Sequence, residues 1–351
     1  MTMVLEGRRQ LVIVVLACLV VGFAGAPASA AGPVITLRAG ASEAQGTTVP
    51  AMALARFCEL AAKLSNGQLN VQPFYQSLGI EQQLAEAVKA GSVDIGYTST
   101  SNLARFTDAF LEFDLPFLFK NDKAYINVLE NYPFGKKAIA QFEKDLGVKV
   151  LMITSHAYDA EVNGTGLVTR NKPVMVPADI QGLKLRTMST PVEINLIKAF
   201  GGNPTPVDYA QVYSALQQGV VDGLGGMYLS PFVSLKLYEV SKYYVALDLR
   251  NILVLVYMNQ QKFNSLTPFQ QKALLEAAAQ TEPLAGQFAR DLVKTATATV
   301  EKNGVRIIHP TKDQLARWLS VREGVWQQSA KEFKDKIDLQ VAKDIYELNQ
   351  R

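Results

Sequence analysis

The sequence predicts an α/β protein made of two similar lobes that face each other across a ligand cleft. The first observation is a strand–helix–strand–helix–strand order over residues 34–97. The second is the same order over residues 183–221. The third is a shared phrase, V-K-A-G-S-V-D at 88–94 and L-Q-Q-G-V-V-D at 216–222, which reads as a helix end, a glycine stop and a strand that opens on an aspartate. Because order and phrase recur together, we predict two related lobes.

Apolar runs and turn residues mark the elements of the first lobe. Ser65-Asn66-Gly67 ends the first helix and Gly91 ends the second. The predicted strands cover residues 34–39, 69–74 and 93–97, and the predicted helices cover residues 50–64 and 81–90.

The second lobe follows the same plan. Thr190 offers a hydroxyl N-cap, Pro191 stands at the first helical position and Glu193 follows three residues after the cap, which predicts a helix start. The two glycines at 201–202 end that helix, and Asp208 opens another that Gly219 closes. The predicted strands cover 183–187 and 204–207, and a third begins at 220–221.

Further segments connect the lobes. The stretch 115–119 predicts a buried turn or edge, 148–154 a strand, 243–259 a β-rich segment long enough to cross back, and 305–308 one more strand. Thr267-Pro268 caps a helix predicted to run to about residue 302, kinked at Pro283 and long enough to span both lobes. The C-terminal part from 311 predicts amphipathic helix, with Trp318 and Trp326 as packing residues. The predicted division is 31–161 plus 249–290 for lobe I, and 162–248 plus 291–351 for lobe II.

The N-terminus is typical of an export signal. Arg8-Arg9 precedes an apolar run at 11–23 and an A-S-A site, so we predict a signal peptide over 1–30 with cleavage after Ala30 and a periplasmic mature chain. Ordinary export is favoured over the twin-arginine route, and Cys18 is a weak lipidation candidate. No later stretch reaches about eighteen uninterrupted apolar residues, so we expect no membrane span in the mature chain.

Composition and missing motifs exclude several function classes. A formal net charge of +3 with no basic block argues against nucleic acid as a partner. Cys58 stands in an apolar helical pattern, which predicts a buried structural cysteine. The chain has two histidines and no H-E-x-x-H, G-x-S-x-G, C-x-x-C or phosphate-loop motif, and G-T-G at 164–166 reads as a turn. The sequence therefore predicts no catalytic residues, no metal and no cofactor.

Arg186 is the first candidate for ligand binding. It lies between a strand end and the cap of the next helix, where open α/β sheets bind anions. A solvated or ion-paired surface role is the alternative from position alone. His156 also stands at a strand end, and it either faces the ligand or is satisfied locally.

The chain resembles the extracytoplasmic solute-binding proteins of TRAP transporters, of the DctP type. The resemblance rests on I-Q-G-L-K-L-R at 180–186 and V-Y-S-A-L-Q-Q-G-V-V-D-G at 212–223, supported by L-P-F-L-F at 115–119, A-G-S-V-D at 90–94 and L-T-P at 266–268. It implies a periplasmic binding protein-like fold that closes over a small organic acid. It also implies that Arg186 pairs with the ligand carboxylate and that a membrane permease, contacted transiently, uses an ion gradient for transport.

Two departures from the family pattern bear on the ligand. No arginine stands near Thr165-Gly166, where many relatives carry a second one, and L-G-G at 224–226 replaces an acidic residue and an asparagine. These changes predict a bulky or aromatic monocarboxylate, in a pocket near Met188, Gly223, Leu224, Gly226, Met227 and Tyr228. The alternative keeps a second anchor elsewhere and a C4-dicarboxylate, 2-keto acid or sugar acid as ligand.

Loops of the first lobe supply the remaining candidates. By position, the loops after its first and third strands line the cleft, through Ser42, Glu43, Gln45, Thr98, Ser99 and Asn102. Their alternative role is turn formation and hydration. Two other function classes stay open: a sensory receptor, which would share every pocket feature, and a secreted α/β enzyme.

Overall fold

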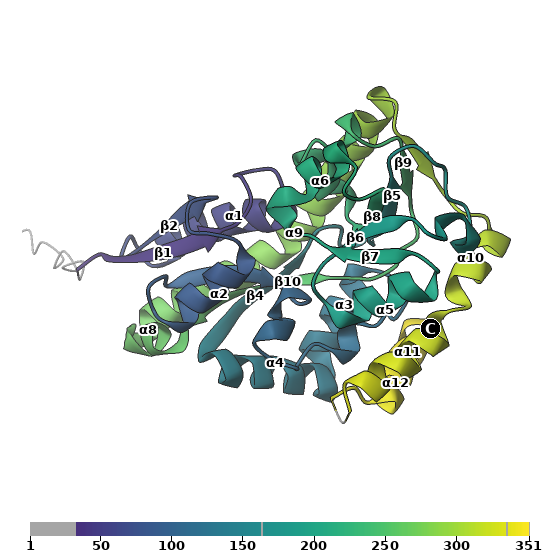
Figure 1. The fold of residues 1–351 in the computed structure, drawn as a ribbon. Coiled ribbons are helices and arrows are strands. Elements are labelled where there is room, and N and C mark those ends of the chain that lie inside the picture. Colours follow the sequence, from purple (N-terminus) through teal and green to yellow (C-terminus); the bar gives the residue numbers. More distant parts are fainter. Residues whose placement is uncertain (1–32, 163, 335, 351) are drawn as a thin grey trace, which may run out of the picture.

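The computed structural model describes residues 33–162, 164–334 and 336–350, so the predicted signal peptide and its cleavage site lie outside the described residues. Two β-sheets with helices packed around them form the framework, and the long helix α9 runs behind both (Figure 1). Within the described ranges, every helix is too short or too polar to span a bilayer.

The first sheet has five strands in the order β2-β1-β3-β10-β4. β1 is parallel to both of its neighbours, and β10 is antiparallel to β3 and to β4. The crossing strand β10 thus returns from the second sheet to the middle of the first. The bounds are Ile35–Ala41 for β1, Leu69–Tyr75 for β2, Ile95–Ser99 for β3, Val148–Ser155 for β4 and Leu253–Asn259 for β10.

The second sheet has six strands in the order β11-β9-β5-β8-β6-β7. β6 is parallel to β7 and β8, and β5 is antiparallel to β8 and β9. Read from β7, the order β7-β6-β8-β5 repeats the order β2-β1-β3-β10 of the first sheet, including strand directions. The bounds are Gly166–Thr169 for β5, Lys184–Thr187 for β6, Asn203–Pro206 for β7, Gly223–Met227 for β8, Tyr243–Val245 for β9 and Arg306–Ile308 for β11.

The shared sequence phrase has one structural role in both sheets. A carboxylate oxygen of Asp94 accepts a hydrogen bond from the backbone N–H of Arg38 in β1 at 2.7 Å. The corresponding oxygen of Asp222 accepts from the N–H of Lys184 in β6 at 2.8 Å. Each aspartate therefore joins the entry of the third strand of its repeat to the first strand, which supports the predicted relation between the two lobes.

Helices cover both sheets and link them. α9 has 35 residues, begins at the predicted Thr267 cap and continues through Pro283. It packs against α1 and β4 of the first sheet and against α7 and β11 of the second, as its predicted spanning role requires. The bounds are Val49–Leu64 for α1, Glu81–Lys89 for α2, Asp122–Asn131 for α3, Pro133–Leu146 for α4, Pro191–Ala199 for α5, Val212–Gln218 for α6, Leu229–Ser234 for α7, Gln260–Ser265 for α8, Pro268–Lys302 for α9, Lys312–Leu319 for α10, Arg322–Glu332 for α11 and Leu339–Gln350 for α12.

The structure corrects three local predictions. The third strand of the second repeat begins at Gly223, because the backbone N–H of Val220 still bonds to the helix carbonyl of Ala215. Gly166 begins strand β5 and is not part of a turn. The hydroxyl of Thr190 makes no cap bond at the start of α5.

The C-terminal helices divide between the sheets. Trp318 of α10 packs in the apolar cluster of the second sheet, with Phe200 and Leu196. Trp326 of α11 and Ile345 of α12 pack in the cluster that contains α3 and α4 of the first. The sequence-based division assigns 291–351 to lobe II, whereas the last helix buries its apolar face on the side of the first sheet.

Candidate functional site

A cavity of about 340 Å³ lies between the two sheets. Its wall is built largely from residues at or just beyond the carboxyl ends of strands, as expected for ligand sites in α/β folds. The first sheet contributes Ser42, Glu43, Gln76, Ile80, Glu81, Gln82, Ser99 and Asn102. The second sheet and the connecting segments contribute His156, Thr165, Arg186, Met188, Ser189, Val207, Asp208, Tyr209, Ala210, Gly226, Met227, Tyr228, Pro231, Leu235 and Ile252.

Most of the residues singled out in the sequence meet at this cavity. Arg186, the leading candidate, lies in its wall together with three of the four second-lobe neighbours that the sequence favoured by their apolar character. The predicted residues that line the cavity are Ser42, Glu43, Ser99, Asn102, His156, Arg186, Met188, Gly226, Met227 and Tyr228.

Four predicted contacts lie away from the cavity wall. Leu224 is fully buried in the apolar cluster behind β8, because alternate residues of a strand face opposite sides of the sheet. Gly223 abuts the backbone of Val168 in β5. Thr98 points its hydroxyl at the Tyr257 hydroxyl, 2.6 Å away, and Gln45 is exposed at the loop tip. The prediction is corrected for these residues.

Arg186 is a buried cation in the cavity wall. Its side chain is 5% exposed, and its Nε donates to the carbonyl of Val207 at 2.9 Å. Among the described residues, no ion pair includes Arg186. Burial lowers the pKa of the guanidinium, which remains charged at any physiological pH. A buried charge of this kind is stabilised when an anion pairs with it.

Two carboxylates, those of Glu43 and Glu81, line the cavity on the side of the first sheet. Glu81 Oε2 accepts from the N–H of Ser99 at 2.8 Å, from its hydroxyl at 2.6 Å and from Asn102 Nδ2 at 2.8 Å. Glu43 accepts from Ser42 Oγ at 2.9 Å and makes a short hydrogen bond with the Tyr97 hydroxyl. Burial raises the pKa of the Glu43 carboxyl to about 7, and the charge of Glu81 contributes to the shift.

His156 gives the cavity a neutral polar group. Its ring lies 5.2 Å from the ring of Tyr228, tilted by 35°. Burial lowers the pKa of His156 to about 4, so the imidazole is neutral at physiological pH. Its Nδ1 is buried and has no hydrogen-bond partner among the described residues.

Tyr228 is held from behind by a buried carboxylate. Its hydroxyl donates to Asp122 Oδ1 at 2.8 Å and accepts from the N–H of Ile252 at 2.7 Å. Asn251 donates to the same Asp122 oxygen at 2.8 Å. Burial raises the pKa of Asp122 to about 7. This network joins the start of α3, the second-sheet wall and the segment that crosses between the sheets.

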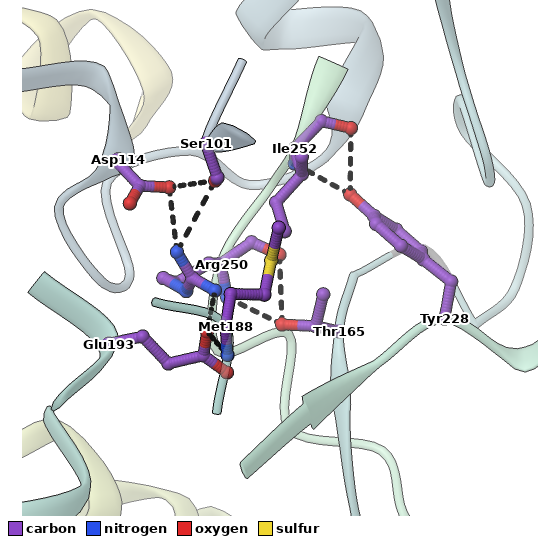
Figure 2. A network of polar contacts seen from close by, with 8 residues as sticks. All are labelled: Ser101, Asp114, Thr165, Met188, Glu193, Tyr228, Arg250 and Ile252. Atoms are coloured by element: carbon purple, nitrogen blue, oxygen red, sulfur yellow. Dashed lines mark hydrogen bonds and ion pairs between the residues drawn. The ribbon is translucent and has the colours of Figure 1, made fainter. Parts of the chain in front are cut away.

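A second buried network lies beside the wall and centres on Arg250, which sequence reasoning missed. Figure 2 shows its guanidinium between two carboxylates, Asp114 at 2.7 Å and Glu193 at 2.9 Å. Glu193 also accepts from the N–H of Met188 at 2.9 Å. The only signal in the sequence is a lone arginine in the long apolar stretch 243–259. Because its guanidinium is engaged by these two carboxylates and Arg250 does not line the cavity, Arg250 does not replace the missing second arginine.

Thr165 occupies the place where the resemblance leads one to expect that arginine. Its hydroxyl accepts from the backbone N–H of Arg250 at 3.1 Å and donates to the Arg250 carbonyl at 3.2 Å. The residue therefore ties the cavity wall to the crossing segment. In the described part of the chain, no group of three or more His, Cys, Asp or Glu side chains is placed to hold a metal ion.

Comparison with known proteins identifies the family. A family model described as bacterial extracellular solute-binding protein, family 7, matches residues 40–332. The 2,3-diketo-L-gulonate-binding periplasmic protein of Escherichia coli is 32% identical over 69% of this chain and 70% of its own length. The C4-dicarboxylate-binding periplasmic protein of Rhodobacter capsulatus is 28% identical over 79% of this chain and 81% of its own length.

A solved structure agrees with the fold described above. The crystal structure of a TRAP periplasmic solute-binding protein from Roseobacter denitrificans, with bound β-D-glucuronate, superposes with a TM-score of 0.79. It is 26% identical, and the match covers 89% of this chain and 99% of that one. The predicted resemblance and fold class are confirmed. The two-sheet chain with its intervening cavity belongs to family 7 of the bacterial extracellular solute-binding proteins, the family of TRAP solute receptors.

Proposed function

We propose that this protein is a periplasmic receptor that captures an organic acid anion through Arg186 and delivers it to the membrane permease of a TRAP transporter. The observation that carries the proposal is the buried guanidinium of Arg186, which lies in the cavity wall without an ion-pair partner among the described residues. A planar guanidinium can hold a carboxylate through two parallel hydrogen bonds. Exclusion of water on closure of the two lobes strengthens that pair.

The charges of the cavity wall favour a ligand with a single carboxylate. Arg186 is the one cation in the described wall, since His156 is neutral, and the wall also contains the acidic residues Glu43, Glu81 and Asp208. A second carboxylate of the ligand would approach these groups without a cation to pair with, and like charges at short range repel. This arrangement argues against a C4-dicarboxylate, although the relative from Rhodobacter capsulatus is named for binding one.

The apolar part of the wall favours a ligand with bulk. Met188, Met227, Tyr228, Leu235 and Ile252 line the cavity on the side of the second sheet and the crossing segment. Such side chains stabilise a ligand by removing its apolar surface from water. A bulky or aromatic monocarboxylate would bury its ring or chain there.

Sugar acids are the main alternative. The relatives from Escherichia coli and Roseobacter denitrificans are associated with 2,3-diketo-L-gulonate and β-D-glucuronate. The polar side chains of Gln76, Glu81, Gln82 and Asn102 would suit the hydroxyl groups of such a ligand. A sensory receptor would share the cavity, and co-purification with permease subunits distinguishes the transport role from it.

A thermal-shift screen of the mature chain tests the proposed ligand class. Ligands that bind only the folded state raise the melting temperature by mass action. The panel contains aromatic monocarboxylates, sugar acids, 2-keto acids and C4-dicarboxylates at equal concentration. A shift with the aromatic acids supports the bulky monocarboxylate. A shift only with dicarboxylates would contradict the argument from wall charge, and a shift only with sugar acids would replace the first ligand class by the alternative.

A further inference from the structure

The Glu43 and Glu81 carboxylates stand in the cavity wall without a cationic partner. Among the described residues, no ion pair includes either of them. Their contacts are with neutral donors: Ser99 and Asn102 at Glu81, and Ser42 and Tyr97 at Glu43. A carboxylate as buried as that of Glu43 costs free energy to keep ionised when no cation pairs with it.

The two acids are also close enough to act on each other. Burial raises the pKa of Glu43 to about 7, and the negative charge of Glu81 is the second cause of that shift. Glu43 is 7% exposed and Glu81 is half-buried. A positive group placed beside both would offset this repulsion and favour the ionised form of Glu43.

The hydrogen bonds at Glu81 leave one of its two carboxylate oxygens without a donor among the described residues. All three donors from Ser99 and Asn102 reach Oε2. Among the described residues, no side-chain or backbone donor is assigned to Oε1, although Glu81 lines the cavity. A carboxylate with one oxygen fixed and the other open is oriented to accept from a ligand.

A bound ligand carboxylate would increase the excess of negative charge in the cavity. The described wall holds three acidic residues and one cation, Arg186, and the ligand carboxylate that pairs with Arg186 adds another negative charge. Arg186 belongs to β6 of the second sheet, whereas Glu43 follows β1 of the first sheet and Glu81 begins α2, which packs on β3. A ligand with a carboxylate at one end and a cation at the other would satisfy both sides of the cavity and link the lobes on closure.

We propose that Glu43 and Glu81 form a subsite for an ammonium group, and that the physiological ligand is an amino-substituted organic acid whose ammonium and carboxylate lie at opposite ends. The inference rests on the proposed contact of Arg186 with the ligand carboxylate. The ammonium donates to the open oxygen of Glu81 and lies against the Glu43 carboxylate. Charge-assisted hydrogen bonds of this kind are stronger than those of a neutral hydroxyl.

Two matched series of acids test the subsite by calorimetry on the mature chain. The first is 4-(aminomethyl)benzoate, 4-(hydroxymethyl)benzoate and 4-methylbenzoate. The second is 6-aminohexanoate, 6-hydroxyhexanoate and hexanoate. In the series that fits the cavity, we expect the amino compound to bind about tenfold or more tightly than both of its neutral partners, the difference of a charge-assisted hydrogen bond. Glu81→Gln is expected to reduce that ratio by about tenfold, because the neutral amide no longer pairs with the ammonium.

A matched variant on the same helix controls for general effects. Glu86 lies on the exposed face of α2 and does not line the cavity, so Glu86→Gln should leave the preference for the amino compound unchanged. Equal affinities within a series, or a hydroxy compound that binds most tightly, would overturn the ammonium subsite while leaving Arg186 and the proposed function intact. If neither these series nor the broader screen contains a binding acid, the proposed function fails first and the subsite with it.

Discussion

Arg250 Nη2 lies 2.9 Å from Glu193 Oε2, although Arg250 belongs to the crossing segment and Glu193 to the first turn of α5. Both side chains are 1% exposed. Asp114, on the side of the first sheet, completes the group at 2.7 Å from Nη1. One buried cation therefore joins both sides of the cavity to the segment that connects them (Figure 2).

This relationship predicts that Arg250→Met destabilises the fold. The variant keeps the length of the side chain but leaves two buried carboxylates without a cation, so we expect a loss of about 3–5 kcal/mol in the free energy of unfolding. Urea denaturation measures it. Glu193→Gln combined with Arg250→Met should recover part of the loss, since one of the unpaired charges is gone. A single variant as stable as the wild type would show that the group contributes nothing net.

Arg186 is expected to determine affinity more than stability. In Arg186→Ala the bound carboxylate loses its buried partner, so affinity should fall by about 3–5 kcal/mol, or roughly two to three and a half decades in Kd. Arg186→Lys should restore only part of it, because an ammonium cannot reproduce the fork of a guanidinium. Calorimetry with the best acid from the screen measures both. Unchanged affinity in Arg186→Ala would remove this residue from the anchoring role.

The sequence predicts the framework well where a pattern is local. The end of α1 follows from Ser65-Asn66-Gly67, the start of α9 follows from the Thr267 cap, and the repeated phrase predicts matching roles for Asp94 and Asp222. Arg186 could be placed in the cavity because its position at a strand end is itself a local feature. In each case the residues that decide the outcome are neighbours in the chain or share a repeated pattern.

The rest of the site depends on partners that are distant in sequence. Arg250 and Asp114 are 136 residues apart in sequence, and no local pattern near either residue predicts their ion pair. Glu81 reads as an ordinary acidic residue in the first turn of a helix, yet its carboxylate turns to Ser99 and Asn102 in the next strand and loop. The sequence predicts Leu224 in the pocket because it stands where relatives carry a polar residue, yet the side of the sheet that it faces is set by the pairing of β8 with its neighbours, and Leu224 packs in the apolar cluster.

Asp122 predicts a pH dependence of stability. Its pKa is raised from 3.8 to about 7 by burial, so between these values the unfolded chain releases this proton while the folded chain keeps it. The contribution of Asp122 to stability therefore falls as pH rises through this window and reaches its low plateau above about 7. The amide of Asp122→Asn does not titrate, so the variant lacks this loss of stability. The melting temperature of the wild type should therefore exceed that of the variant by more at pH 5 than at pH 8.

Other buried acids titrate in the same window, so the comparison needs a control. The pKa values of Glu43 and Glu282 are also raised to about 7 by burial. Asp313 is exposed on α10, and Asp313→Asn should follow the wild-type pH profile. If Asp122→Asn follows that profile as well, Asp122 is ionised in the folded protein across the whole range.

Two glycines offer a matched test of packing at the cavity sheet. A Cβ at Gly223 would collide with the backbone carbonyl of Val168 in the neighbouring strand, which cannot move without breaking the pairing of β5 and β8. A Cβ at Gly324, exposed in α11, would meet no atom within 4 Å. Gly223→Ala should therefore cost about 1–3 kcal/mol through overpacking. Gly324→Ala should stabilise the protein by about 0.5–1 kcal/mol, because alanine favours the helix. Urea denaturation of both variants checks the signs, and a stable Gly223→Ala would mean that β5 and β8 can separate without loss.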